Sequence, residues 1–292
     1  MENVLITRLR SHVERLAGEI GERNVFVPAA LARAAGYIED EWAALGYPVE
    51  RLEYDVSGVR CANLVAARMG SARPSEILLL GAHYDSVLGC PGANDNASGV
   101  AALLELSRMF RAIEPCLTVR FVAFVNEEPP FFQTPQQGSM VYAEAARRRG
   151  DDIRLMASLE TMGCYRQEPG SQSYPPVFRY FFPDRGNFLG IVSDFRSGAA
   201  MRRLARAFRQ RSDFPLQTVA TFRFIPGVSW SDHRSFWVQG YPAMMVTDTA
   251  FYRYRHYHTA TDTPDKLAYP EFAQATLGLF EAFVVLAREG LP

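Results

Sequence analysis

The stretch ILLLG at residues 77–81 is a continuous apolar run with the length of one β-strand. Such a run, in which apolar and polar residues do not alternate, is typical of a strand that is buried on both faces. The segment VRFVAFV at residues 119–125 has the same character, and residues 153–159 predict a third strand of this kind. The three segments therefore indicate the interior strands of a sheet that is covered from both sides.

Helical patterns lie between and around these strands. Apolar residues recur at helical spacing in residues 1–20 and 28–45. Further helices are predicted over 98–112, 138–149, 197–211 and 271–288, and further strands over 49–56, 60–68, 188–192 and 243–246. This alternation favours an α/β fold with a mostly parallel central sheet flanked by helices on both faces. Residues 165–186, rich in Pro, Tyr, Phe and Gly, are expected to form a loop excursion within a single domain of residues 1–292.

The charge balance of the chain argues against two classes of partner. Its 292 residues include 31 basic and 32 acidic ones, for a net charge of −1. Binding of nucleic acid or of an anionic membrane through bulk charge is therefore not expected, and no run of 18 apolar residues predicts a transmembrane helix. The N-terminal segment lacks the apolar core of a signal peptide, so a cytoplasmic location is expected, with secretion left open. The sequence does not indicate an oligomeric state.

The cysteines do not form a recognisable motif. Cys61, Cys90, Cys116 and Cys164 contain no C-x-x-C pair, which argues against a thiolate zinc site or a thioredoxin-like motif. Buried free thiols are the favoured interpretation, and a pairing of Cys90 with Cys164 stays open. The sequence also lacks the HExxH, GxSxG, GxGxxG and GKS/T motifs of other common enzyme classes.

Histidines and carboxylates follow the predicted buried strands, where open α/β sheets bind their ligands. They are His83 and Asp85 after residues 77–81, Glu127 and Glu128 after residues 119–125, Glu160 after residues 153–159, Asp95 in GANDNASG at 92–99, and His258 in YHTATDT at 257–263. Each has an ordinary structural explanation when taken alone, such as a helix cap for Asp95. Taken together, these imidazole nitrogens and carboxylate oxygens match the donors that zinc or a similar divalent metal prefers.

The donor set is rich enough for two metal ions. A bridging carboxylate can hold two metals roughly 3.5–4 Å apart, and each metal then needs terminal ligands. One further acid must stay free to take a proton from water. Adjacent residues of an extended chain point in opposite directions, so Glu127 and Glu128 can divide the roles of proton acceptor and ligand.

The sequence resembles the zinc aminopeptidases of peptidase family M28, which are zinc-dependent exopeptidases. The matching blocks follow the order of the family between residues 82 and 263. They are AHYDS at 82–86, GANDNASG at 92–99, NEE at 126–128, SLETMG at 158–163, SDHRSFW at 231–237, GYPAMMVTDTA at 240–250 and YHTATDT at 257–263. The resemblance implies the α/β fold of those exopeptidases.

The resemblance also implies a set of metal ligands. His83 and Glu160 would bind one zinc ion, Glu128 and His258 would bind a second, and Asp95 would bridge the two. Several members of the family carry Asp where this chain has Glu160, which puts the strength of that metal site in question. A non-proline cis peptide bond is implied after Asp95.

Three further roles are implied for residues beside the ligands. Glu127 would be the general base, Tyr257 would donate a hydrogen bond to the developing oxyanion, and Asp85 would orient the imidazole of His83. Asp232 and Asp262 lie in matching blocks without a definite role.

The implied activity is hydrolysis of the N-terminal peptide bond of a peptide or aminoacyl substrate, with two Zn²⁺ per chain. Two alternatives stay open: a glutaminyl cyclase with one zinc, and an inactive peptidase-like fold that serves as a binding module. The complete ligand set favours the aminopeptidase. Aromatic residues in 165–186 and 250–255 are candidates for a pocket that receives an apolar side chain.

Overall fold

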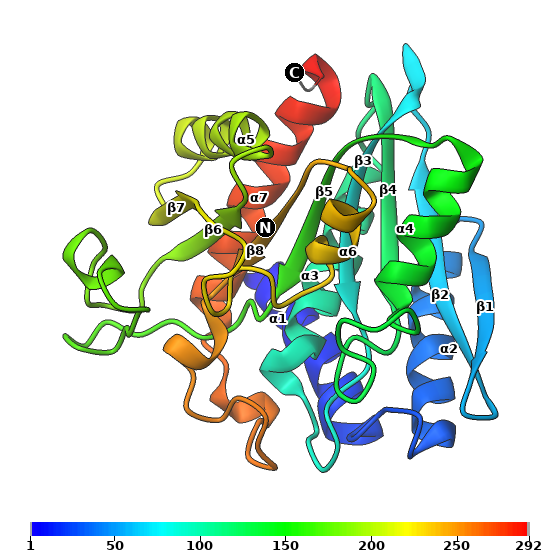
Figure 1. The fold of residues 1–292 in the computed structure, drawn as a ribbon, viewed down its shortest axis with the longest axis horizontal. Helices are drawn as coiled ribbons and strands as arrows, with labels where there is room; N and C mark the ends of the chain where they lie inside the picture. The colour runs from blue at the N-terminus through cyan, green and yellow to red at the C-terminus, as the bar shows by residue number, and fades with distance from the viewer. Residues whose placement is uncertain (1, 291–292) are drawn as a thin grey trace.

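The computed structural model describes residues 2–290, and Met1, Leu291 and Pro292 lie outside that range. Within it, the chain forms a sheet of eight strands between two layers of helices (Figure 1). The strands are β1 Glu50–Val56, β2 Val59–Arg68, β3 Arg73–His83, β4 Leu117–Phe124, β5 Asp152–Glu160, β6 Leu189–Ser193, β7 Leu216–Ala220 and β8 Ala243–Thr247.

The interior of the sheet is parallel, as predicted. The spatial order of the strands is β1-β2-β4-β3-β5-β8-β6-β7. The four central strands β4, β3, β5 and β8 pair in parallel. The pairs β1–β2, β2–β4 and β6–β8 are antiparallel, and β6–β7 is parallel. The carboxyl ends of β3, β4 and β5 therefore meet at one edge of the sheet.

Helices cover both faces, which confirms the predicted architecture. They are α1 Glu2–Val13, continued by a π-helix over Glu14–Ile20, α2 Pro28–Ala44, α3 Gly99–Phe110, α4 Gly138–Arg149, α5 Gly198–Arg211, α6 His233–Val238 and α7 Tyr269–Glu289. Helices α4 and α6 lie on one face, and α1, α2, α3, α5 and α7 lie on the other (Figure 1).

The alternation of side chains along the buried strands explains these two layers. In β3, Leu78 and Leu80 belong to the larger apolar core under α1, α2, α3, α5 and α7, whereas Ile77 and Leu79 belong to the smaller core under α4 and α6. Successive residues of a strand point to opposite faces. A strand that supplies both cores must be apolar at every position, and this requirement accounts for the run at 77–81.

Two elements were missed by the sequence analysis. Strand β7 is a five-residue strand at the edge of the sheet, and four of its residues are only partly buried, so it carries no apolar run. Helix α6 has six residues, which is too few for a helical period to show. The other predicted elements are present with boundaries shifted by a few residues.

Two remaining expectations concern α7 and the cysteines. Among the described helices, α7 alone is long and apolar enough to cross a membrane, and 61% of its apolar window is buried inside the fold. It packs along the sheet as a core helix (Figure 1). All four cysteines are free, and Cys61, Cys90 and Cys164 are buried.

Candidate metal centre

The seven predicted histidines and carboxylates of the site lie at one edge of the sheet. Strand β3 ends at His83 and its neighbour β5 ends at Glu160, while β4 leads into Glu127 and Glu128. The register pairs Gly81 of β3 with Ser158 of β5. Two residues further along both strands, His83 and Glu160 reach the same height. Parallel pairing therefore brings together residues that are far apart in the sequence.

Two loops complete the group. Asp95 lies in the helical turn Ala93–Ser98, where the Asp95–Asn96 peptide bond is cis, as the family resemblance implied. His258 lies in the loop after β8. The backbone takes positive φ at Asn126 (59°), Thr161 (50°) and His258 (56°). Residues other than glycine rarely adopt this left-handed conformation, and it recurs where side chains are held in functional positions.

Asp95 lies between the two histidines. Its Oδ1 is 3.3 Å from Nε2 of His83, and its Oδ2 is 3.0 Å from Nε2 of His258. Nε2 of His83 also lies 3.4 Å from Oε2 of Glu160, and Nε2 of His258 lies 3.2 Å from Oε2 of Glu128. The cluster thus has two halves, and each half uses a different oxygen of Asp95.

Each half has the geometry of a metal-binding group. The donor atoms of His83, Asp95 and Glu160 lie within 4.8 Å of one another, and so do those of Asp95, Glu128 and His258. A third group, His83 with Glu127 and Glu128, meets the same criterion. The structure therefore brings together the five predicted ligands, and their roles stay a prediction.

The buried polar atoms of this cluster fit a cation. Both ring nitrogens of His83, Oδ1 of Asp95 and Oε1 of Glu128 are buried and lack a hydrogen bond within the described chain. A buried polar atom without a partner costs free energy, and a metal ligand is a common reason for one. Four carboxylates in the cluster face two imidazoles, so divalent cations would also balance the charge.

Perturbed acidities express the same imbalance. Burial, reinforced by repulsion from Asp95, raises the pKa of Glu128 to about 8. Burial likewise raises the pKa of Glu160, and it raises that of Glu127 well above its ordinary range. For Asp95, burial acts upward, but contacts with His258 and His83 outweigh it and lower the pKa. Carboxylates with such different acidities, packed this closely, are typical of functional sites.

The histidines respond in the opposite sense. Burial acts to lower the pKa of His258, but Asp95 and Glu128 outweigh it and raise that pKa to about 10. The pKa of His83 is also raised, because Glu160, Asp85 and Asp95 outweigh the effect of burial. With these raised pKa values, the ring nitrogens of both imidazoles carry protons at the positions that a metal ion would occupy. A metal ion would therefore release protons on binding.

Asp85 does more than the sequence suggested. Its Oδ1 lies 3.5 Å from Nδ1 of His83, in agreement with the predicted orienting role. The two carboxylate oxygens also accept hydrogen bonds, each of 3.1 Å, from the backbone N–H groups of Glu127 and Glu128. Asp85 thereby ties the end of β3 to the residues after β4.

Asn96 and Asp262 hold the turn that carries Asp95. Asn96 donates a hydrogen bond to the carbonyl of Leu159 and accepts one from the N–H of Thr161, so it links this turn to the end of β5. Asp262 accepts hydrogen bonds from the N–H groups of Asn94 and Asp95 at 2.8 and 3.1 Å. Sequence analysis left Asp262 without a role and missed Asn96, although both lie in the matching blocks.

Ser231 and Asp232 lie beside Glu160. The hydroxyl of Ser231 donates a 2.7 Å hydrogen bond to Oε2 of Glu160 and lies 2.8 Å from the hydroxyl of Ser158. Asp232 is fully buried, and burial raises its pKa to about 7. The sequence analysis did not assign Ser231 to the site, because a single serine gives no signal of metal binding. It left Asp232 without a definite role.

The other histidines lie outside the cluster. His233 is buried, its Nε2 contacts the carbonyl of Val228 at 2.8 Å, and burial lowers its pKa to about 4. His12 is buried beside Glu105, and His256 contacts the hydroxyl of Thr261. These contacts give all three histidines structural roles.

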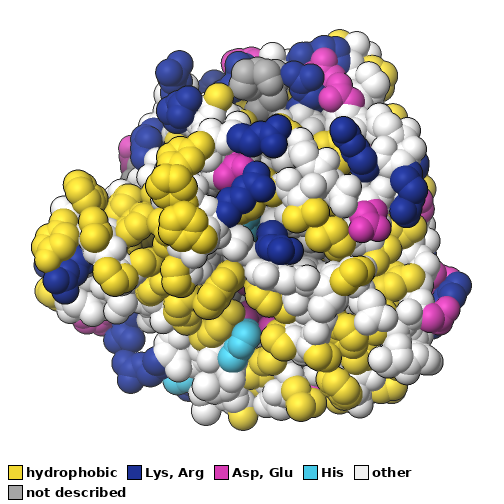
Figure 2. Space-filling model, in the orientation of Figure 1, with side chains coloured by type: hydrophobic (Ala, Val, Ile, Leu, Met, Phe, Trp, Pro, Cys, Tyr) yellow, Lys and Arg dark blue, Asp and Glu magenta, His cyan; other side chains and the backbone are white. Residues whose placement is uncertain are grey.

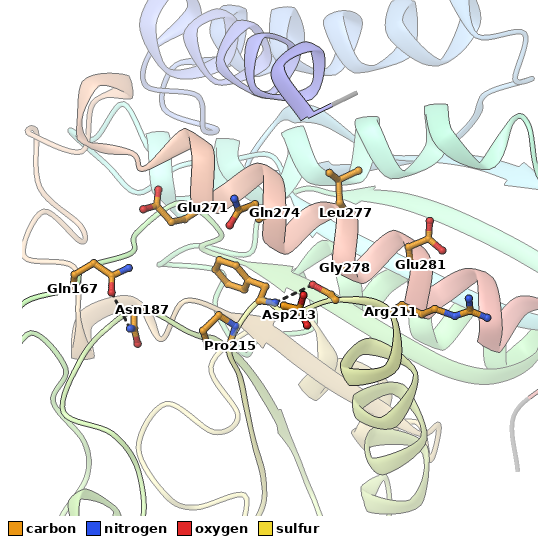
Figure 3. Close-up of a pocket in the computed structure, with 12 residues that line it drawn as sticks. Gln167, Asn187, Arg211, Asp213, Pro215, Glu271, Gln274, Leu277, Gly278 and Glu281 are labelled. Carbon is orange, nitrogen blue, oxygen red and sulfur yellow. Dashed lines mark hydrogen bonds between the residues drawn. The ribbon is translucent and has the colours of Figure 1, made fainter.

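A cavity of about 230 Å³ opens beside the cluster, and its lining includes Glu127 and Tyr257. The ring of Tyr257 stacks on His258 with 3.9 Å between ring centroids. Burial and the nearby Asp95 and Glu128 raise the pKa of Tyr257, so the phenol keeps its proton. A larger groove, of about 580 Å³, lies between α7 and the loop after α5 (Figure 3) and contains none of the predicted site residues.

Comparison with known proteins agrees with these observations. The sequence model of peptidase family M28 matches residues 63–282. A protein of Escherichia coli called uncharacterized protein YfbL is 39% identical over 258 residues, covering 85% of this chain and 78% of that protein. A probable zinc metalloprotease of Pyrenophora teres f. teres is 30% identical over 56% of this chain, which spans only 36% of that protein's length.

Solved structures share the fold. The aminopeptidase from Aneurinibacillus sp. strain AM-1 superimposes with a TM-score of 0.60 at 26% identity, over 80% of this chain and 50% of that one. The zinc aminopeptidase BSAP from Bacillus subtilis reaches 0.77 at 14% identity, over 97% and 95% of the two chains. A glutaminyl cyclase from Fimbriiglobus ruber reaches 0.73 at 20% identity, over 96% and 95%.

The family match covers most of the chain and includes every residue of the cluster. The metalloprotease and aminopeptidase names among its relatives agree with the donor set at the carboxyl ends of β3, β4 and β5. The chain therefore belongs to peptidase family M28, a family of metal-dependent peptidases.

Proposed function

We propose that the protein is an aminopeptidase that hydrolyses the first peptide bond of a peptide or aminoacyl substrate with two Zn²⁺ bound. The supporting observation is the two-sided cluster around Asp95, in which each carboxylate oxygen faces a different histidine. His83 and Glu160 would hold one ion and Glu128 and His258 the other. When bound, such a pair acts as a Lewis acid on the scissile carbonyl and lowers the pKa of water.

Glu127 is the proposed general base. It is the carboxylate of the Glu127–Glu128 pair that lies apart from His258, and it lines the cavity beside the cluster. Its carboxylate takes the proton of the attacking water and passes it to the departing amine. Burial disfavours the charged form of Glu127, and bound cations would restore it. The hydrogen bonds from the two backbone N–H groups to Asp85 fix the position of Glu127 relative to Glu128.

Tyr257 is the proposed donor to the oxyanion. Its phenol lines the same cavity as Glu127, and its raised pKa keeps the hydroxyl proton available for a hydrogen bond. Stacking on His258 holds the ring beside the proposed ligand that it directly precedes in the sequence. A donor placed in advance stabilises the developing negative charge without further reorganisation.

A glutaminyl cyclase is the second candidate, because the fold is shared with a protein of that name. Such an enzyme transfers the acyl group to the substrate's own amine and needs no water. The complete set of five donor residues, including His83, favours the hydrolytic reaction. The same completeness argues against an inactive binding module.

The deciding experiment combines elemental analysis with two substrates. The protein is purified in zinc-containing buffer, and its metal content is measured together with cleavage of leucine p-nitroanilide and cyclisation of an N-terminal glutaminyl peptide. Two zinc ions per chain and release of nitroaniline are expected. Cyclisation without release of nitroaniline, at one zinc per chain, would identify a cyclase. A chain that binds no zinc under these conditions would contradict both enzymatic candidates.

A further inference from the structure

A small cavity, with a volume of about 150 Å³, lies behind the segment that leads to Tyr257 and His258. Its lining combines residues 164–166, at the start of the excursion, with residues 253–256 and Lys266. It shares no lining residue with the cavity beside the metal centre, so the two are separate spaces. At about 30 Å³ per molecule of liquid water, the space fits a small ion or a single chemical group and not a peptide.

The charged side chains in this lining are basic. They are Arg166, Arg253, Arg255 and Lys266, and neither Asp nor Glu is among the described residues that line the cavity. In the orientation shared by Figures 1 and 2, the loop after β8 runs along the lower left of the molecule. Figure 2 shows Lys and Arg side chains there, below the apolar side chains that cover the excursion. Positive charges around a small space attract an anion.

Two acids outside the cavity offset part of this charge. Oε2 of Glu168 lies 3.5 Å from Nε of Arg166, and Oδ2 of Asp265 lies 2.6 Å from Nζ of Lys266. Both carboxylate side chains are 67% exposed, so water weakens these pairs. Arg255 is exposed and makes no ion pair with any residue of the range 2–290. The cavity therefore keeps about two positive charges.

Arg253 is the buried member of the basic set, with a side chain that is 5% exposed. Its Nη1 donates to the carbonyls of Cys164 and Phe188 at 2.9 Å each, and its Nε donates to the side-chain oxygen of Gln172 at 2.8 Å. These acceptors are neutral. Burial lowers the pKa of Arg253, and the more distant Asp248 does not offset that effect. A buried cation without a paired acid costs free energy, which an anion in the adjoining cavity would reduce.

Two hydrogen-bond donors of the cavity's lining residues also lack an acceptor. Nη2 of Arg253 and the hydroxyl of Tyr165 are buried and have no partner within the described chain. The two side chains are neighbours, because the guanidinium carbon of Arg253 lies 5.7 Å from the centre of the Tyr165 ring. A guanidinium nitrogen can only donate. An oxyanion would supply acceptors for these donors, whereas a cation or an apolar group would not.

A phosphate-type anion fits this cavity better than a single carboxylate. A phosphate group carries a charge of about −1.5 to −2 at neutral pH, which matches the positive charge that the two exposed acids leave in place. Its several oxygens also suit the planar fork of an arginine, which binds phosphate through two parallel hydrogen bonds.

The cavity is connected to the metal centre through its lining. The hydroxyl of Tyr254 donates a 2.7 Å hydrogen bond to Oδ1 of Asp262. The carboxylate of Asp262 in turn accepts hydrogen bonds from the N–H groups of the turn that carries Asp95. The same lining segment continues directly into Tyr257 and His258. An anion held by this segment would therefore restrict the motion of residues at the metal centre.

We propose that this cavity binds a phosphate-type oxyanion between Arg253, Arg255 and Lys266, and that the bound anion stabilises the conformation of residues 253–258. The site is separate from the proposed peptidase reaction and adds a second class of ligand. Free phosphate and the phosphate group of a small organic phosphate present the same oxygens, so the test includes both.

Calorimetric titration of the zinc-loaded protein at constant ionic strength tests the binding. The titrants are inorganic phosphate, glucose 6-phosphate and chloride. At least one of the two phosphates should bind with a Kd below about 1 mM, and chloride should not bind. Tighter binding of glucose 6-phosphate would identify an organic phosphate as the source, and tighter binding of inorganic phosphate would identify the free ion. Absence of binding by both at ten times that concentration would overturn the proposal.

Variants separate the cavity from the metal centre, because phosphate oxygens can also bind zinc. Arg255→Gln and Lys266→Met should each weaken phosphate binding at least fivefold, since each removes a charged donor, while zinc content stays at the wild-type value. Arg33→Gln, at an exposed arginine of α2, is the matched control. Glu128→Gln alters the metal centre and should leave phosphate affinity unchanged. Loss of binding in Glu128→Gln but not in Arg255→Gln would place the phosphate on the metal centre and overturn the proposal.

Hydrogen exchange tests the effect on the segment. Saturating phosphate should slow exchange of the backbone amides of residues 253–258 at least fivefold in the wild-type protein. It should not do so in Arg255→Gln at the same concentration. The turn at Ser57 and Gly58, between β1 and β2, provides an internal control whose exchange should not change. Equal exchange rates of residues 253–258 with and without phosphate would refute the stabilising effect. These readouts do not depend on whether the protein cleaves peptides.

Discussion

Two buried clusters of this protein combine histidine with carboxylate, and they are built differently. In the first, His12 of α1 has its Nε2 3.2 Å from Oε1 of Glu105 of α3, and Nε of Arg108 donates to the other oxygen of Glu105 at 2.8 Å. The hydroxyl of Tyr37 contacts Nδ1 of His12. One acid is shared between a cation and an imidazole, and each of these polar groups has a partner.

The metal centre lacks that balance. Around Asp95, four carboxylates face two imidazoles, and four buried donor or acceptor atoms of the cluster make no hydrogen bond within the described chain. Both clusters combine buried histidine with carboxylate, so the presence of that combination does not distinguish them. Excess negative charge and a concentration of unpartnered atoms do, because both cost free energy that a bound cation would offset. Each prediction below separates the two clusters or tests this distinction.

The largest effect is expected from Glu127→Gln. The amide keeps the shape of the side chain but cannot accept the proton of water, so kcat should fall by about 10²- to 10⁴-fold. Zinc content, measured by elemental analysis, should stay at the wild-type value, because Glu127 is not one of the proposed ligands. Wild-type turnover in this variant would remove Glu127 from the mechanism.

Removal of metal should produce the next largest effect. A site held at 1,000 times its dissociation constant contributes about 4 kcal/mol to the free energy of unfolding. Chelation should therefore lower the Tm, and zinc should restore it. Glu128→Gln should abolish most of this response while leaving the metal-free protein as stable as the wild type, because the raised pKa of about 8 keeps Glu128 largely protonated at neutral pH. If the Tm of the wild-type protein does not change with zinc, the cluster around His83 and Asp95 needs no metal, and it does not differ from the His12 cluster in this respect.

The sequence was sufficient to predict the central sheet and the principal donor residues of the cluster. Buried strands such as residues 77–81 are visible because both faces require apolar residues, and the side chains at their ends follow from the parallel order. Strand β7 and helix α6 were invisible because neither is long enough to show a period. The supporting residues were invisible for a different reason: Asn96 and Ser231 act through hydrogen bonds to segments more than 60 residues away. Such contacts exist only once the chain has folded.

Ser231→Ala should have a smaller effect than loss of a donor. The hydroxyl donates a hydrogen bond to Oε2 of Glu160 and thereby fixes the orientation of that side chain. Loss of a partner that orients a metal ligand typically weakens metal binding by about 10- to 100-fold. Titration of the metal-free protein with zinc should show one of two binding events weakened. Ser229, two residues earlier, accepts a hydrogen bond from Gln133 through its backbone carbonyl, which the substitution leaves in place, so Ser229→Ala serves as the control.

The smallest effect, and the sharpest test of the comparison, is Glu105→Gln. Burial acts to raise the pKa of Glu105, but His12 and Arg108 outweigh it, so the folded-state pKa lies below the ordinary 4.5. A carboxyl with a depressed pKa stabilises the fold above pH 4.5, and that contribution is lost as the pH falls through the folded-state pKa. The variant should lose about 1–2 kcal/mol near pH 7, and the difference from wild type, measured by urea unfolding, should shrink below pH 4.5. Zinc content and kcat should not change, because this cluster satisfies its own charges; a variant that loses zinc would show that the two clusters are coupled and that charge balance alone does not separate them.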